Sequence, residues 1–205
     1  MNYKYLLMLR YSLINLVGLT FLFVLITQGY LSKAIKADIT NMVIVIIGVF
    51  SLGYVLAAYR TFWISKELNY AMKKKLSTSS LASEYVSNTK KLDASSRNNL
   101  AISLRLKLAT KINLIKFISN TLVILGLIGT VVGFIIALSG VDGSVSSNPE
   151  EVSKMVSTLI QGMSVALYTT LVGSICSVWL NICFQILSTG TNKLLSRIIE
   201  IGEKK

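Results

Sequence analysis

The side chains that could carry proton or metal chemistry are unevenly placed along this sequence. All nine carboxylates lie outside the long uncharged stretches, and those stretches contain no lysine or arginine either. The chain has no histidine, which excludes a histidine-based metal site and a Ser-His catalytic triad. We therefore expect no enzyme activity, no metal site and no cofactor. A protein that moves protons through a membrane normally needs a titratable group inside it, and this chain alone has none.

Hydroxyl side chains do occur within the last two uncharged stretches, where they stand among small residues. Thr130 lies between Gly129 and Gly133, which form a small-xxx-small pair. In the last stretch small residues recur at helical spacing along one face, namely Gly162, Ala166, Thr169 or Thr170, Gly173 and Ser177. Small residues allow membrane helices to approach closely, and threonine hydroxyls can hydrogen-bond across the contact. By itself this pattern indicates helix packing.

The elements that position these residues follow from the distribution of charge. Charged residues bound four uncharged runs, at residues 11–32, 39–59, 117–141 and 155–192. Each run has at least the roughly 20 residues that a helix needs to cross the hydrocarbon core. The whole chain is 53% hydrophobic and only 15% charged, which is typical of a membrane protein. Unbroken runs of this length exclude barrel strands, so we predict an all-α fold with four transmembrane helices.

Lysine and arginine gather in three places: the N-terminus, the segment after the second run and the C-terminus. The first short loop has only Lys33 and Lys36, and the second has only Lys154. By the positive-inside rule, both termini and the long basic segment are expected in the cytoplasm. The net charge of +12 lies in blocks between apolar runs, which suits anionic lipid headgroups and argues against nucleic-acid binding.

Four parts are predicted along the chain. Residues 1–63 form a two-helix transmembrane hairpin, and residues 64–116 form a basic, helical cytoplasmic segment. Residues 117–192 hold the third and fourth helices, with an outer-side loop at 141–154, and residues 193–205 form a short cytoplasmic tail.

The last helix has a strong start signal. Asn148 suits the N-cap, Pro149 the first position, and Glu150 and Glu151 the positive end of the helix dipole. No proline follows, so one helix can continue past Gln185 and exceed the roughly 30 Å thickness of the hydrocarbon core. It must protrude from the membrane.

The third helix also begins before its apolar run. Asp93 to Ser96 can cap a helix that leads into it. Residues 104–108 alternate like a strand, but a strand there would have no partner, so we predict helix. The last two helices are both expected to extend into the cytoplasm.

Residues 126–138, GLIGTVVGFIIAL, and residues 162–174, GMSVALYTTLVGS, together resemble the MotA/TolQ/ExbB proton-channel family. That family has a Gly-Leu-x-Gly-Thr-x-x-Gly helix, an outer-side loop and an Ala-Leu-x-x-Thr-x-x-Gly helix. The resemblance spans about residues 117–185. It implies an ion path along Thr130 and Thr170, with Thr169 beside them. The pore-lining and helix-packing residues that it implies are Gly126, Gly129, Gly133, Ala166, Gly173 and Ser177.

The resemblance also explains why the chain lacks its own membrane carboxylate. In the family, the titrating aspartate belongs to a single-span partner of the ExbD/TolR/MotB type, present as a dimer within a ring of five channel subunits. The implied function is a stator subunit of a proton-driven rotary motor in the bacterial inner membrane. Val165 stands where ExbB-type members commonly have glutamate, so the subfamily, the driven load and the choice of proton or sodium stay open.

Two other classes of function are compatible with parts of the sequence. A passive membrane scaffold or assembly factor would use the glycine-rich helices only for packing, and would not depend on the membrane potential. A small-solute transporter would require broken helices and internal repeats, and the sequence has neither.

Overall fold

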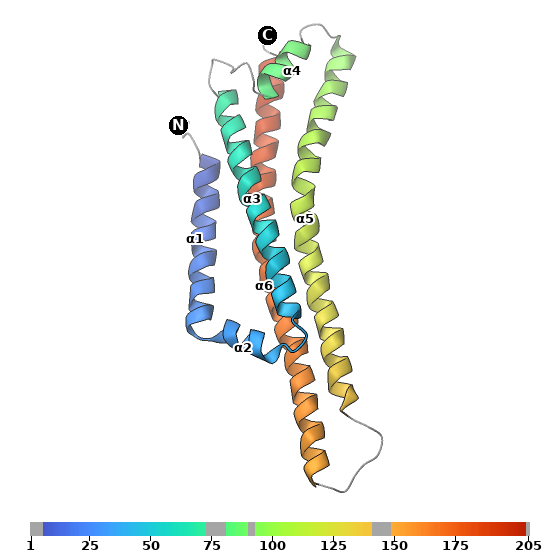
Figure 1. The fold of residues 1–205 in the computed structure, drawn as a ribbon. Coiled ribbons are helices and arrows are strands. Elements are labelled where there is room, and N and C mark those ends of the chain that lie inside the picture. The colour runs from blue at the N-terminus through green and yellow to red at the C-terminus, as the bar shows by residue number, and fades with distance from the viewer. Residues whose placement is uncertain (1–5, 73–80, 90–92, 141–148, 204–205) are drawn as a thin grey trace. The chain divides into compact units, whose positions relative to one another are not determined.

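The computed structural model describes residues 6–72, 81–89, 93–140 and 149–203. These residues form six helices and no strand: α1 (Leu6–Thr27), α2 (Tyr30–Ala37), α3 (Met42–Met72), α4 (Leu81–Thr89), α5 (Ala94–Ser139) and α6 (Pro149–Glu203) (Figure 1). Within this described part, α1, α3, α5 and α6 are each long and apolar enough to cross a membrane. The prediction of an all-α chain with four helices able to cross a membrane is therefore confirmed.

Contacts between helices divide the chain into two compact units. Unit 1 comprises Met1–Val17, Tyr54–Lys116 and Asn181–Lys205, and unit 2 comprises Gly18–Gly53 and Phe117–Leu180. Each of the four long helices contributes one stretch to each unit.

Large aliphatic side chains form the interior of unit 1. Every third or fourth residue of α5 and α6 in this unit is buried, as the helical repeat requires for a single inward face. These residues are Leu104, Leu108, Ile112 and Ile115 of α5, and Leu187, Leu194 and Ile198 of α6. The short helix α4 packs on the end of α6, where a Cβ atom at Gly202 would lie 2.8 Å from the ring of Tyr85 (Figure 1).

The first apolar run is not one continuous helix. α1 ends at Thr27, and a separate eight-residue helix, Tyr30–Ala37, follows it. Gly29 separates the two with a φ of +74°, a left-handed conformation that glycine adopts without a steric penalty. Residues 30–32 were predicted to lie inside the first span, and the turn at Gly29 corrects that boundary.

Asp38, four residues before α3, binds the backbone at the start of that helix. Its carboxylate accepts hydrogen bonds from the backbone N–H of Val43 at 2.6 Å and from the hydroxyl of Thr40 at 2.5 Å. Asp38 is only 4% exposed. Its carboxylate therefore loses most of its hydration, and these two donors compensate for that loss. Asp38 thereby caps α3.

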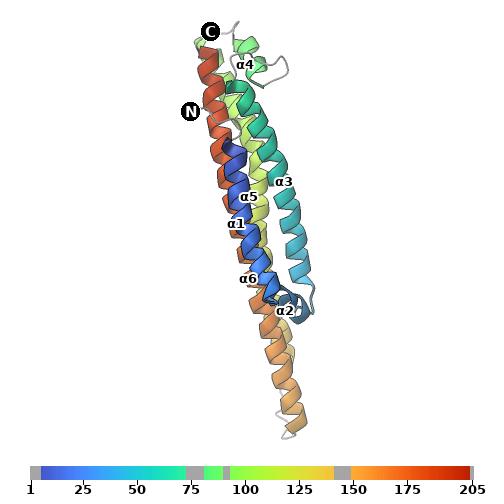
Figure 2. The same cartoon turned by 90° about the vertical axis from the view of Figure 1, so that its left-hand side faces the viewer.

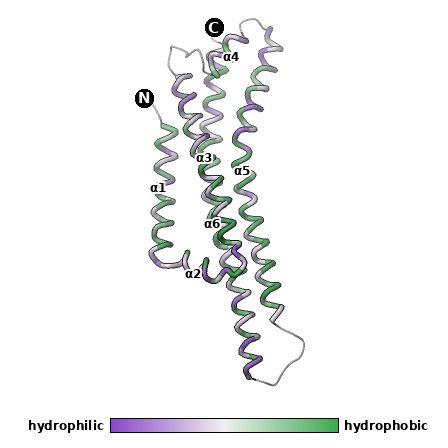
Figure 3. The backbone as a smooth tube through the Cα atoms, in the orientation of Figure 1, coloured by the Kyte–Doolittle hydropathy of each residue, from purple (hydrophilic) through white to green (hydrophobic). Residues whose placement is uncertain are grey.

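The three later long helices continue beyond their apolar runs. α3 extends from the second run to Met72, and α5 begins well before the third run. α6 begins at Pro149 and has 55 residues, which corresponds to a length of about 80 Å. The prediction of one unbroken helix past Gln185 is confirmed, whereas Asn148 lies outside the described residues. Figure 3 shows hydrophilic residues at the start of α6 and hydrophobic ones along the second half of α5.

The predicted cap of α5 is present. The backbone N–H of Ser96 donates to the Asp93 carboxylate at 3.3 Å, and this hydrogen bonding lowers the pKa of Asp93. Residues 104–108 are helical as predicted, because their buried leucines follow the helical repeat of α5.

Candidate functional site

The second half of α5 and the first half of α6 lie side by side in unit 2 (Figures 1 and 2). Their backbones touch along a row of small residues, which we call the glycine seam. The seam consists of Gly126, Gly129 and Gly133 of α5 with Gly162, Ala166 and Gly173 of α6. A Cβ atom at Gly133 would lie 2.5 Å from the backbone nitrogen of Ala166, and one at Gly173 would lie 2.8 Å from the carbonyl of Leu122. Only glycine permits so close an approach at these positions.

Two threonine hydroxyls meet where the seam brings the helices together. Thr130 of α5 and Thr170 of α6 are hydrogen-bonded through their Oγ1 atoms. Each hydroxyl is also within reach of the Gly126 carbonyl, at 3.1 Å for Thr130 and 3.2 Å for Thr170. The two hydroxyl hydrogens can therefore satisfy only two of three contacts at once, so they can exchange between alternative acceptors. Such a pair can accept from a donor or solvate a cation.

Thr169, the neighbouring candidate, lies in a different environment. It is 0% exposed, and its hydroxyl donates to the carbonyl of Val165 on its own helix at 2.8 Å. A Cβ atom at Gly129 would collide with the Thr169 side chain, which fills the space that this glycine leaves. Thr169 therefore packs inside the seam, while Thr130 and Thr170 are half-buried beside it.

The face of the hydroxyl pair is apolar and is not covered by α1 or α3. Those two helices contact α6 at Trp179: a Cβ atom at Gly18 would lie 2.5 Å from the indole, and the Phe50 and Trp179 ring centroids are 5.5 Å apart. Trp179 is nine residues from Thr170, which places it about half a turn away around the helix. Large apolar side chains remain exposed within two turns of the hydroxyl pair: Val123, Leu127, Phe134, Met163 and Leu167.

A second hydroxyl pair was not predicted. Ser119 of α5 donates to the backbone carbonyl of Ser177 at 2.9 Å, and the two Oγ atoms are 3.3 Å apart. Both residues are buried. Ser177 was predicted as a packing residue, but Ser119 was not. Its spacing of seven residues from Gly126, two helical turns, is the signal that could have identified it.

The stretches of α5 and α6 that carry the hydroxyl pair contain no acid or base. The uncharged runs that supply these parts of α5 and α6 contain no Asp, Glu, Lys, Arg or His. The described residues also contain no group of three or more potential metal ligands. The site therefore offers hydroxyl and carbonyl oxygens.

Comparison with known proteins identifies the family. The model of the MotA/TolQ/ExbB proton channel family matches residues 65–200, more than half of the chain and all of the site. No curated protein and no solved structure matches the chain. The resemblance inferred from the two glycine-threonine motifs is thus confirmed: the chain belongs to the MotA/TolQ/ExbB proton channel family.

Proposed function

We propose that this chain is the ion-conducting subunit of a motor driven by the ion-motive force, with Thr130 and Thr170 on the ion path. In this proposal five copies form a ring in the bacterial inner membrane, with both termini in the cytoplasm. The ring surrounds a dimer of a single-span partner of the ExbD/TolR/MotB type, whose aspartate binds the ion. Proton binding and release turn the ring relative to the partner.

The single observation that carries the proposal is the meeting of two hydroxyls from different spanning helices. Thr130 and Thr170 come together beside the Gly126 carbonyl and are partly exposed, about half a turn around α6 from the contacts of α1 and α3 at Trp179. Oxygen lone pairs of the two hydroxyls can still accept hydrogen bonds, so the pair can interact with a polar partner in a way that it cannot with lipid chains. The carboxylate of a guest helix would supply that partner.

The packing of the seam supports this division of roles. Thr169 lies inside the contact between α5 and α6, where it touches the Gly129 position and is shielded from any guest helix. We therefore give Thr169 a packing role and restrict the ion path to Thr130 and Thr170. A purely passive scaffold could use the Thr130–Thr170 pair for packing alone, so the two functions are distinguished by whether ion uptake depends on these hydroxyls.

The test uses the complex that co-purifies with this chain, reconstituted in liposomes that contain a pH-sensitive dye. A potassium diffusion potential drives proton uptake. We expect Thr170→Val, and separately Thr130→Val, to lower the uptake rate at least about tenfold, because each removes a hydroxyl that stabilises the moving charge. Thr170→Ser retains the hydroxyl and should retain most of the uptake.

Thr121→Val is the matched control. Thr121 lies on α5, as Thr130 does, and its hydroxyl donates to the backbone carbonyl of Phe117 in the same helix. It is nine residues from Thr130 and therefore about half a turn away around α5. Loss of uptake in this control, or full uptake in Thr170→Val, would contradict the proposed path. Replacement of external sodium by choline, at an unchanged potassium gradient, identifies the ion, because a proton path is insensitive to that replacement.

A further inference from the structure

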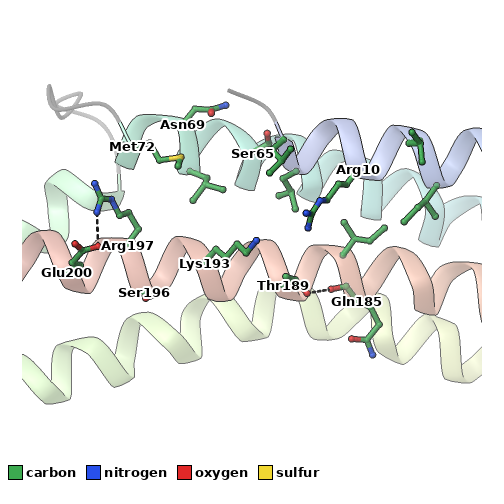
Figure 4. A pocket seen from close by; sticks show the side chains of 16 residues that line it. Arg10, Ser65, Asn69, Met72, Gln185, Thr189, Lys193, Ser196, Arg197 and Glu200 are labelled. Carbon is green, nitrogen blue, oxygen red and sulfur yellow. Dashed lines mark hydrogen bonds and ion pairs between the residues drawn. The ribbon is translucent and has the colours of Figure 1, made fainter. Parts of the chain in front are cut away.

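Unit 1 contains a cavity of about 640 Å³ between α1, α3 and α6 (Figure 4). This volume is within the range of pockets that bind small molecules. Apolar side chains line the part next to α1, including Leu13 and Ile14. Polar and charged side chains of α6 line the opposite wall, and Ser65 and Asn69 of α3 add hydrogen-bonding groups.

Three cations face this cavity: Arg10, Lys193 and Arg197. Arg197 is paired with Glu200, with 2.7 Å between Nη1 and Oε2. Within the described residues, Arg10 and Lys193 form no ion pair with a carboxylate. Figure 4 shows both of these side chains extending into the space between α1 and α6. Two positive charges that share one cavity repel each other. An anion between them would be attracted to both and would offset that repulsion.

The positions of these cations along the chain place them at the level of lipid headgroups. Arg10 immediately precedes the first uncharged run, and Lys193 immediately follows the last one. Leu13 and Ile14, one turn further along α1, lie within the apolar run and line the same cavity. The cavity thus has a cationic rim at the membrane boundary and an apolar wall that leads into the hydrocarbon region.

We infer that this cavity binds one anionic phospholipid, with its phosphate between Arg10 and Lys193 and an acyl chain along Leu13 and Ile14. The charge of the rim selects an anionic headgroup, since a zwitterionic lipid would leave the two cations uncompensated. The apolar wall selects a lipid over a soluble phosphate. This site is separate from the glycine seam and does not depend on the proposed ion path.

The test is native mass spectrometry of the purified chain, titrated with phosphatidylglycerol or phosphatidylcholine in detergent. We expect phosphatidylglycerol to bind in preference to phosphatidylcholine. The double variant R10Q/K193Q should weaken phosphatidylglycerol binding by roughly 10- to 50-fold, because it removes two cations at headgroup level. The variant R10K/K193R keeps both charges and should bind about as well as the unaltered chain.

R105Q/K107Q is the matched control, since it removes two exposed cations of α5 that do not line the cavity. Equal losses in the two neutralised variants would mean general charge attraction and would overturn the site. Unchanged phosphatidylglycerol binding by R10Q/K193Q would also overturn the lipid site. That result is expected if a neighbouring copy of the chain fills the cavity. Equal competition by glycerol 3-phosphate would assign the site to a soluble phosphate instead.

Discussion

α6 passes through both units, and its buried face changes in character between them. In unit 2 its buried positions are mostly small, including Gly162, Ala166 and Gly173, whereas in unit 1 large aliphatic residues such as Leu187 and Leu194 are buried among smaller ones. α5 changes in the same way, from Leu108 and its neighbours in unit 1 to the glycines of the seam in unit 2. One pair of helices therefore uses two packing modes.

The solvent around each region explains the difference. Much of unit 1 lies outside the uncharged runs, where burial of large aliphatic groups away from water stabilises the fold. Unit 2 lies mainly within those runs, where lipid is as apolar as leucine and association depends on close contact and hydrogen bonds. The stability of unit 1 should fall when a large buried side chain is shortened. The stability of unit 2 should fall when a methyl group is added to a glycine of the seam.

The largest effect is expected from Leu194→Ala in unit 1. Leu194 is 0% exposed and lies beyond the last uncharged run, so its truncation leaves a cavity in a region stabilised by burial. We expect a loss of about 2–5 kcal/mol of unfolding free energy, seen as a lower thermal midpoint in detergent. Leu106→Ala is the control, because Leu106 is 62% exposed. Similar losses in the two variants would contradict the proposed packing of unit 1.

Gly133→Ala should have the next largest effect, through the opposite change. The added methyl group would lie 2.5 Å from the Ala166 nitrogen and 2.6 Å from the Gly162 carbonyl, so the two backbones must separate. We expect the unfolding free energy to fall by about 1–3 kcal/mol, seen as a lower thermal midpoint in the same assay. Gly48→Ala is the control, because no other atom lies within 4 Å of its added methyl group. If both glycine variants behave alike, the seam is not the close contact described above.

The membrane-spanning helices could be predicted because charge marks their ends. The long α6 could also be predicted, since Pro149 and two glutamates begin it and no later proline interrupts it. The turn at Gly29 was missed because one glycine in an apolar run gives only a weak signal, and its positive φ is visible only in three dimensions.

The side-chain pairings were harder to predict than the elements. The two motifs indicated Thr130, Thr169 and Thr170 together, but a sequence pattern does not tell which of two adjacent threonines faces into a helix contact. The rotation of about 100° between adjacent residues of α6 turns Thr169 into the helix contact and brings Thr170 to Thr130. The cavity could not be predicted, because Arg10 and Lys193 come from opposite ends of the chain.

Thr169→Val tests whether Thr169 and Thr170 have different roles. It should affect proton uptake much less than Thr170→Val does. Valine keeps the shape that fills the space beside Gly129 and loses only a hydroxyl bonded to its own helix. Proton uptake in the reconstituted complex should change less than about twofold, whereas the same substitution at Thr170 should nearly abolish it. A loss at Thr169 as large as that at Thr170 would return Thr169 to the ion path.

The smallest effect is expected at Glu67, on the part of α3 that continues beyond the second uncharged run. Its carboxylate accepts the backbone N–H of Leu81 at the start of α4, at 3.2 Å, and is half-buried. Burial raises the pKa of Glu67 above its ordinary value, and the hydrogen bond from Leu81 only partly offsets this.

The sign of the pH dependence follows from that direction. Because the pKa is higher in the folded state, folding favours the protonated carboxyl, and stability contributed by Glu67 falls as the pH rises from the unfolded pKa through the folded one. Glu67→Gln mimics the protonated form and still offers an oxygen to Leu81. The variant should therefore match the unaltered chain at low pH and exceed its thermal midpoint slightly at neutral pH. A midpoint lowered at neutral pH would mean that the charged carboxylate stabilises the contact between α3 and α4, and that burial is not the dominant influence on Glu67.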